Sequence, residues 1–195
     1  MNVLDKNYWN NRYLKNESGW DVGEISTPLK AYFDQLTNKN LSILIPGAGN
    51  AYEAEYLVNA GFQNVYVCDF AEEPLKNLSK RCPEIKKENL LQGDFFELPQ
   101  KGFFDLIIEQ TFFCAIDPAL RQAYFKKVHQ LLKPNGKLVG VLFNDTLNKD
   151  HPPFGGSKTE YTDYFINLFK INVYDTCYNS IKPRAERELF INLEK

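Results

Sequence analysis

The chain has 195 residues, of which 44% are hydrophobic and 25% charged, and its formal net charge is −2. This length and composition predict one globular α/β domain over residues 1–195, because the chain is long enough for one buried core and short for two. The lack of a basic surplus argues against nucleic acid as a partner. No apolar run approaches the roughly 18 residues of a membrane span, and the N-terminus has no signal-like pattern, so we expect a cytoplasmic protein.

The residue types that hold metals are few and scattered. The four cysteines are widely spaced and form no CxxC motif, and neither of the two histidines completes a metal-binding group with them. We therefore expect no metal, reduced thiols, and no mechanism centred on histidine.

The N-terminal residues predict a helix followed by a polar loop. Trp9 and Tyr13 are four positions apart, so a helix over residues 6–15 places both rings on one face. Trp20 lies in the polar loop, where a large aromatic residue either anchors the loop or covers a ligand. We interpret residues 1–40 as a helical lid over a cofactor.

Residues 41–52 predict a strand, a glycine turn and a helix. Residues 42–46 have the apolar character of a buried parallel strand, and residues 51–59 have helical character. Gly47 and Gly49 suit the turn between them because glycine accepts a positive φ and lets a ligand lie against the backbone. This pattern is typical of a nucleotide-like cofactor site.

The same turn argues against a dinucleotide. A dinucleotide-binding turn has the pattern G-x-G-x-x-G, and Tyr52 stands where the third glycine belongs. A nicotinamide-dependent oxidoreductase therefore remains only an alternative, supported by the first two glycines and by Asp69.

The rest of the chain alternates strands and helices until its final third. Expected strands cover residues 65–69, 90–91, 104–109, 137–143, 171–178 and 187–193, and expected helices cover residues 71–80, 118–132 and 160–168. Thr27, followed by Pro28, is expected to cap a further helix, and a threonine is expected to cap the helix at 160. The last two strands lack a long helix between them, which predicts a mostly parallel sheet with an added antiparallel strand.

Acidic and flat residues follow successive predicted strands. Asp69 ends the second strand, Asp94 and Phe95 follow the third, and Glu109 and Gln110 follow the fourth. Carboxyl ends of strands form the edge at which open α/β sheets bind ligands. The set matches S-adenosylmethionine, with Asp69 for the ribose hydroxyls, Asp94 for the adenine amine and Phe95 against the adenine ring.

The N-terminal aromatic residues fit the same ligand. The donor sulfur is cationic, so the faces of Trp9, Tyr13 and Trp20 are expected to attract it by roughly 0.5 to 2 kcal/mol. The predicted cofactor is therefore S-adenosyl-L-methionine, with S-adenosyl-L-homocysteine as the product.

Motifs spread over nearly the whole chain resemble the thiopurine S-methyltransferase family. They are Trp20-Asp21-x-Gly23 with Thr27-Pro28, IPGAGNAYEAEYL, Cys68-Asp69, Gly93-Asp94-Phe95-Phe96, FDLIIEQTFFCAI from Phe104 to Ile116, and Pro152-Pro153-Phe154. The likeness is nearer to plant-type halide and thiol methyltransferases, in which a TFFCAI-like segment also occurs. It implies a three-layer, Rossmann-like class I methyltransferase fold with a seven-stranded sheet of order 3-2-1-4-5-7-6 and strand 7 antiparallel.

The resemblance also implies residues that contact the donor. With the residues inferred from strand ends, the expected set is Trp9, Tyr13, Trp20, Gly47, Gly49, Asp69, Asp94, Phe95, Glu109 and Gln110. Two of them depart from the plant relatives, which tend to have tryptophan at Tyr13 and tyrosine at Gln110.

The expected acceptor is a small soft nucleophile, namely a thiol, a thiopurine, or a halide or thiocyanate. Such a nucleophile needs no strong general base, so none is assigned. Phe113 and Phe154 are the expected walls of its pocket. Arg184, Arg187 and His151 either face the acceptor or lie in solvent, and a non-catalytic donor-binding module stays an alternative. The sequence leaves the physiological acceptor and the oligomeric state open.

Overall fold

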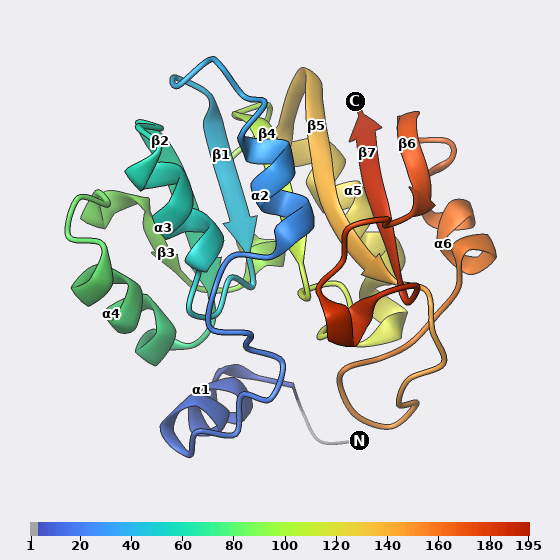
Figure 1. The fold of residues 1–195 in the computed structure, drawn as a ribbon, viewed down its shortest axis with the longest axis horizontal. Helices are drawn as coiled ribbons and strands as arrows, with labels where there is room; N and C mark the ends of the chain where they lie inside the picture. The colour runs from blue at the N-terminus through green and yellow to red at the C-terminus, as the bar shows by residue number, and fades with distance from the viewer. Residues whose placement is uncertain (1–3) are drawn as a thin grey trace.

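The computed structural model describes residues 4–195, which form a seven-stranded sheet between two layers of helices (Figure 1). The strands are β1 (Ser42–Pro46), β2 (Asn64–Asp69), β3 (Leu90–Gln92), β4 (Phe104–Gln110), β5 (Leu132–Phe143), β6 (Lys170–Thr176) and β7 (Glu188–Glu194). Their order is β3-β2-β1-β4-β5-β7-β6, and β7 runs antiparallel to both of its neighbours. The predicted class I fold and strand order are confirmed.

Six α-helices accompany the sheet in the described part of the chain. They are α1 (Lys6–Leu14), α2 (Thr27–Phe33), α3 (Tyr52–Asn59), α4 (Glu72–Arg81), α5 (Arg121–Leu131) and α6 (Lys158–Phe165). Helices α2, α3 and α4 bury leucines such as Leu29, Leu57 and Leu78 on one face of the sheet. Helices α5 and α6 bury Phe125 and Phe165 on the other face. None of these helices is long and apolar enough to span a membrane.

Two helix caps differ from the predictions. The prediction that threonines cap these helices is wrong, because Ser26 is the N-cap residue of α2 and Ser157 is that of α6. Both serines have extended backbone angles, and the Ser157 hydroxyl accepts a hydrogen bond from the Glu160 amide. Thr27 lies inside α2, and its hydroxyl donates instead to the carbonyl of Asn179.

Strand β5 begins earlier than expected. Helix α5 ends at Leu131 and β5 begins at Leu132, so the Pro134-Asn135-Gly136 segment, between the helix expected to end at 132 and the strand expected to begin at 137, lies within β5. The Asn135 amide donates to the Lys195 carbonyl, and the Lys195 amide donates to Gly136, so the C-terminus pairs with this segment and extends it as a strand.

The N-terminal region divides into two parts. Helix α1 lies across the carboxyl ends of the central strands, and its residues are half-buried or exposed (Figure 1). Helix α2, also within the predicted lid of residues 1–40, packs Leu29 and Phe33 into the core. Within residues 4–40, α1 and the segments on either side of it line the cavity at the edge of the sheet. Residues 1–3 of the predicted lid and domain lie outside the described residues.

Candidate active site

A cavity of about 930 Å³ lies between α1 and the carboxyl ends of the strands. It brings together residues from the N-terminal helix and loop and from the turns after β1, β2 and β3. The expected donor-contacting residues that line it are Trp9, Tyr13, Trp20, Gly47, Asp69, Asp94 and Phe95. The remaining three, Gly49, Glu109 and Gln110, are not among its lining residues.

The glycine turn after β1 is closely packed on both sides. Gly47 and Gly49 have φ values of +55° and +52°. A Cβ on Gly47 would lie 2.0 Å from Cδ2 of Phe112, and one on Gly49 would lie 2.5 Å from the hydroxyl oxygen of Tyr13. The turn therefore requires glycine at both positions for backbone angle and for space. Gly49 is covered by Tyr13, whereas Gly47 is open to the cavity.

Asp69 presents a fixed carboxylate to the cavity at the end of β2. Its Oδ2 accepts a hydrogen bond from the Gly49 amide at 2.9 Å, and its Oδ1 accepts one from the Ala71 amide at 2.8 Å. Burial raises the pKa of this carboxyl, and the two amide hydrogen bonds oppose that rise. Since a carboxylate has about four acceptor positions, Asp69 retains capacity for two further donors such as adjacent hydroxyl groups.

The turn after β3 supplies a second acid and two aromatic rings. Asp94 accepts a hydrogen bond from the Phe96 amide at 2.8 Å, which fixes its carboxylate beside the cavity. Phe95 is 2% exposed and contributes to both the core and the cavity wall. Phe96 also lines the cavity, although the sequence analysis did not assign it a role.

Three aromatic rings close the cavity from the N-terminal side. The Trp20 ring packs edge-on against Trp9 and Tyr13, with centroids 5.7 Å and 5.8 Å away. The Arg12 guanidinium, which also lines the cavity, lies 5.2 Å from the Trp20 ring centroid. Burial, with the nearby Asp69 charge, raises the pKa of Tyr13, so its hydroxyl keeps its proton at neutral pH.

Glu109 has a different position from the one expected. It is fully buried, and its Oε1 accepts hydrogen bonds from the Phe112 and Phe113 amides at 2.8 Å and 2.9 Å. Its Oε2 accepts a 2.6 Å hydrogen bond from the Tyr124 hydroxyl. Burial raises the pKa of Glu109 to about 7. Glu109 thus holds the turn after β4 instead of lining the cavity.

Gln110 also lies away from the cavity lining. Its Oε1 accepts a hydrogen bond from the Ser26 hydroxyl at 3.2 Å, which ties β4 to the start of α2. Gln110 therefore links β4 to α2.

The two phenylalanines after β4 lie in different environments, and Phe113 does not line the cavity, contrary to the prediction. Phe113 is 2% exposed and packs at right angles to Tyr161, with ring centroids 5.1 Å apart, so it belongs to the core. Phe112 lines the cavity instead. The cause is Thr111, whose φ of +60° turns the chain before the two rings. Because non-glycine residues rarely adopt this angle, the sequence carried no signal for it.

The end of the cavity away from Asp69 has apolar walls. Phe154 is 3% exposed and lines this end, as the sequence predicted. Cys114, Phe143 and Leu147 also contribute to the apolar lining.

All three residues that the sequence left open reach this end of the cavity. Arg184 is 8% exposed, and it donates from Nη2 to the Trp20 carbonyl at 2.9 Å. Arg187 pairs with Asp145, and the His151 side chain is more than half exposed. The Arg184 guanidinium also pairs with the buried carboxylate of Glu188 at 3.5 Å, so Arg184 is a paired cation that links this end of the cavity to the N-terminal loop.

Comparison with known families identifies the chain. Residues 4–192 match the family described as thiopurine S-methyltransferase (TPMT). The chain belongs to the thiopurine S-methyltransferase family. It is accordingly an S-adenosylmethionine-dependent methyltransferase, as the sequence predicted.

Relatives of this methyltransferase include plant and bacterial enzymes. A probable thiol methyltransferase 2 of Arabidopsis thaliana is 29% identical, with 82% of this chain and 72% of the relative covered. Thiocyanate methyltransferase 1 of Brassica oleracea is 27% identical, with 95% and 84% covered. Thiopurine S-methyltransferase of Vibrio cholerae is 23% identical, with 99% and 94% covered.

Solved structures share the fold of this methyltransferase. A TehB-like S-adenosylmethionine-dependent methyltransferase from Corynebacterium glutamicum has a TM-score of 0.70 at 15% identity, with 97% of each chain covered. The 1,6-didemethyltoxoflavin-N1-methyltransferase of Burkholderia thailandensis, solved with S-adenosylhomocysteine, has a TM-score of 0.71 at 16% identity, with 97% and 86% covered. At these identities the likeness concerns the fold alone.

The residues of the cavity fit the donor of this family. Gly47 has no side chain, and a Cβ there would collide with Phe112, so a ligand can lie against the Gly47 backbone. The Asp69 carboxylate retains free acceptor positions at the same cavity. The aromatic faces of Trp9 and Trp20 suit a cationic sulfur. When bound, the donor supplies a methyl group made electrophilic by that sulfur. Within residues 4–195, no group of three or more histidine, cysteine or acidic side chains is placed to hold a metal ion.

Proposed function

We propose that this methyltransferase methylates a small, soft, anionic nucleophile, in the class of thiolates, thiopurines, halides and thiocyanate. The observation that carries the proposal is the acceptor end, where apolar Phe143 and Phe154 adjoin the buried guanidinium of Arg184. The guanidinium pairs with Glu188 at 3.5 Å, and its remaining N–H groups can donate to an anion, while the apolar walls favour anions that give up their hydration at low cost. The relatives named for thiols, thiocyanate and thiopurines support the same class.

For the donor, we propose separate roles for the residues at the strand ends. Asp69 accepts the ribose hydroxyls, Asp94 accepts the adenine amine, and Phe95 lies against the adenine ring. Gly47 admits the amino-acid part against the backbone. Their common position along the cavity lining supports this assignment.

The N-terminal aromatic residues are proposed to cover the donor. Trp9, Tyr13 and Trp20 pack against one another above the cavity, which supports a role in excluding water. Glu109 and Gln110, expected from the sequence to contact the donor, are proposed to act by positioning the elements that do.

The chemistry requires alignment more than proton transfer. The nucleophile attacks the methyl carbon in line with the carbon–sulfur bond, and the sulfur keeps the bonding pair and leaves as a neutral thioether. An anionic nucleophile has no proton to lose, so the enzyme needs no general base. The exposed position of the His151 side chain agrees with this assignment. Arg184 would hold the anion until the methyl group is transferred.

An acceptor panel tests the proposal. The purified protein is incubated with S-adenosylmethionine and with iodide, thiocyanate, hydrosulfide or 6-mercaptopurine, and a catechol and a primary amine serve as controls. We expect methylated products from the soft nucleophiles and none from the controls. Preferential methylation of the catechol or amine would refute the proposal.

The same preparation addresses the two alternatives. A non-catalytic module would bind S-adenosylmethionine, measured by calorimetry, and methylate no acceptor of any class. A nicotinamide-dependent oxidoreductase would instead bind NADH, detected by its fluorescence. Family membership and the position of Tyr52 in the glycine turn favour methyl transfer over both.

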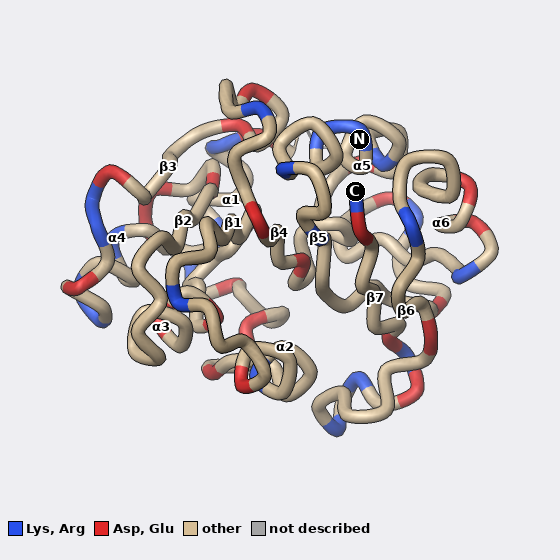
Figure 2. Tube along the Cα trace, turned by 90° about the horizontal axis from the view of Figure 1, so that it is seen from above, with Lys and Arg blue, Asp and Glu red and all other residues tan. Residues whose placement is uncertain are grey.

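We further propose a cytoplasmic enzyme that works on small molecules and not on nucleic acid. The net charge of −2 supports this, as do the acidic and basic residues that alternate around the described trace (Figure 2). All four cysteines are free and buried, as expected of reduced thiols.

A further inference from the structure

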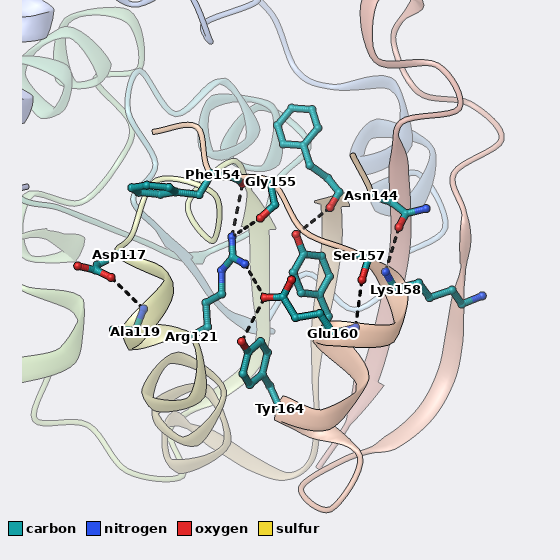
Figure 3. Close-up of polar contacts among 12 residues, drawn as sticks. Asp117, Ala119, Arg121, Asn144, Phe154, Gly155, Ser157, Lys158, Glu160 and Tyr164 are labelled. Carbon is teal, nitrogen blue, oxygen red and sulfur yellow. Dashed lines mark hydrogen bonds and ion pairs between the residues drawn. The ribbon is translucent and has the colours of Figure 1, made fainter. Parts of the chain in front are cut away.

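A buried arginine holds the backbone that carries Phe154 (Figure 3). Arg121, the first residue of α5, is 2% exposed. Its Nη2 donates to the carbonyl oxygen of Gly155 at 2.8 Å and to that of Phe154 at 3.5 Å. Its Nη1 pairs with Oε1 of Glu160 on α6 at 2.8 Å. One guanidinium thus joins α5, α6 and the acceptor wall.

The surroundings of this guanidinium restrict it to one arrangement. Its central carbon lies 4.9 Å from the ring centroid of Phe113 and 5.3 Å from that of Tyr161. A buried charge is costly unless it is paired and hydrogen-bonded, so Arg121 depends on the loop carbonyls as well as on Glu160. The planar fork of arginine allows these acceptors to be bound together, which an ammonium group does not match.

The loop is held equally tightly from its other side. The Phe154 amide donates to the Cys114 carbonyl at 2.7 Å, so Phe154 is fixed through its amide and its carbonyl. A Cβ on Gly155 would lie 2.3 Å from the Leu147 amide nitrogen, and one on Gly156 would lie 2.3 Å from the Tyr161 hydroxyl. Neither glycine therefore has room for a side chain, so the loop backbone packs directly against Leu147 and Tyr161.

We propose that Arg121 is a positioning residue that fixes the Phe154 wall and thereby sets the affinity for the methyl acceptor. Arg121 does not line the cavity, so it acts through the loop and touches neither donor nor acceptor. The inference rests on the proposed function, because it assigns the Phe154 end of the cavity to the acceptor.

The first test compares Arg121→Met and Arg121→Lys with a control, Lys133→Met. The control breaks a 2.8 Å ion pair with Asp105 that lies outside the cavity lining. We expect Arg121→Met to raise the acceptor KM by about tenfold, because lost hydrogen bonds to a charged group have effects of this order. Donor affinity should stay within about twofold, and Arg121→Lys should recover part of the acceptor affinity. An equal loss of donor and acceptor affinity, or an acceptor KM no higher than that of the control, would overturn the proposal.

A double-mutant cycle with Phe154→Ala separates positioning from general destabilisation. If Arg121 acts through the Phe154 wall, Arg121→Met should change the acceptor KM by less than about twofold once that side chain is removed. A further tenfold rise in the double variant would show that the two residues act independently, and it would contradict the proposed role.

Hydrogen exchange gives a readout that does not require turnover. In Arg121→Lys, amides of residues 147–157 should exchange faster by about tenfold, while those of β1 and α3 keep their protection.

If Arg121→Met does not fold, Glu160→Gln replaces it in the kinetic test, and a smaller rise of the acceptor KM in the same direction is expected. Uniform or absent changes in exchange would refute the positioning role. Failure of the wild-type protein to methylate any soft nucleophile would instead refute the proposed function.

Discussion

Substitution of Glu109 by glutamine tests how the turn after β4 is held. The Glu109 carboxyl is fully buried and accepts three hydrogen bonds, two from the Phe112 and Phe113 amides and one from the Tyr124 hydroxyl. Glutamine has the same size, and its oxygen can accept from both amides. Its amino group can donate to the Tyr124 oxygen, so the turn keeps its hydrogen bonds while the ionisable group is removed.

The magnitude follows from the pKa of this group. Burial raises the pKa of Glu109 from its ordinary 4.5 to about 7, because the charged form loses its hydration. Between these two values the folded protein holds a proton that the unfolded chain has released. The resulting stabilisation is complete below pH 4.5 and is lost as the pH rises through 7. At 1.36 kcal/mol per pKa unit, the loss amounts to about 3 kcal/mol.

Urea unfolding of the wild type and Glu109→Gln from pH 4 to pH 8 measures this loss. Other titrating groups are common to both proteins and cancel in the difference. The stability of the wild type relative to the variant should fall by about 3 kcal/mol over the range, mostly between pH 4.5 and 7. A difference that does not vary with pH would refute the reasoning.

Three further substitutions test the proposed donor contact, the glycine turn and the proposed acceptor wall in turn. Asp69→Ala should weaken donor binding by about 10- to 100-fold, since hydrogen bonds to a charged group contribute about 1.5 to 3 kcal/mol, and unchanged affinity in calorimetry would contradict this. Gly49→Ala should lower the free energy of unfolding by about 1 to 2 kcal/mol, because it forces a positive φ on alanine and crowds the Tyr13 hydroxyl; denaturant unfolding measures the loss, and an unchanged midpoint would refute it. Phe154→Ala should alter acceptor KM and preference in steady-state kinetics while donor affinity stays constant, and equal effects on both would exclude the division.

The sequence was sufficient for the fold, and seven of the ten residues expected around the donor line the cavity. Apolar runs located the central strands, and the positive φ required between β1 and α3 identified the glycine turn. Asp69 and Asp94 could be placed together because the carboxyl ends of parallel strands meet at one edge. These features depend on local patterns and on a topology that the family resemblance supplied.

The features that were missed depend on tertiary contacts. Glu109 follows the same rule of strand ends as Asp69, yet the fold buries it under the amides of the next turn. The turn at Thr111, which has a positive φ, places Phe112 at the cavity and Phe113 in the core. Arg121 gave no signal either, because an arginine in the first turn of a helix normally faces solvent. Its partners lie more than thirty residues further along the chain.

A single-turnover experiment follows methyl transfer from bound donor to a soft nucleophile. The protein is loaded with methyl-labelled S-adenosylmethionine, mixed with hydrosulfide or thiocyanate, and stopped at successive times. Each equivalent of bound donor should give one equivalent of labelled methyl product and one of S-adenosylhomocysteine. Donor that binds and stays intact with every soft nucleophile, or passes its label only to oxygen or nitrogen acceptors, would contradict the proposed function.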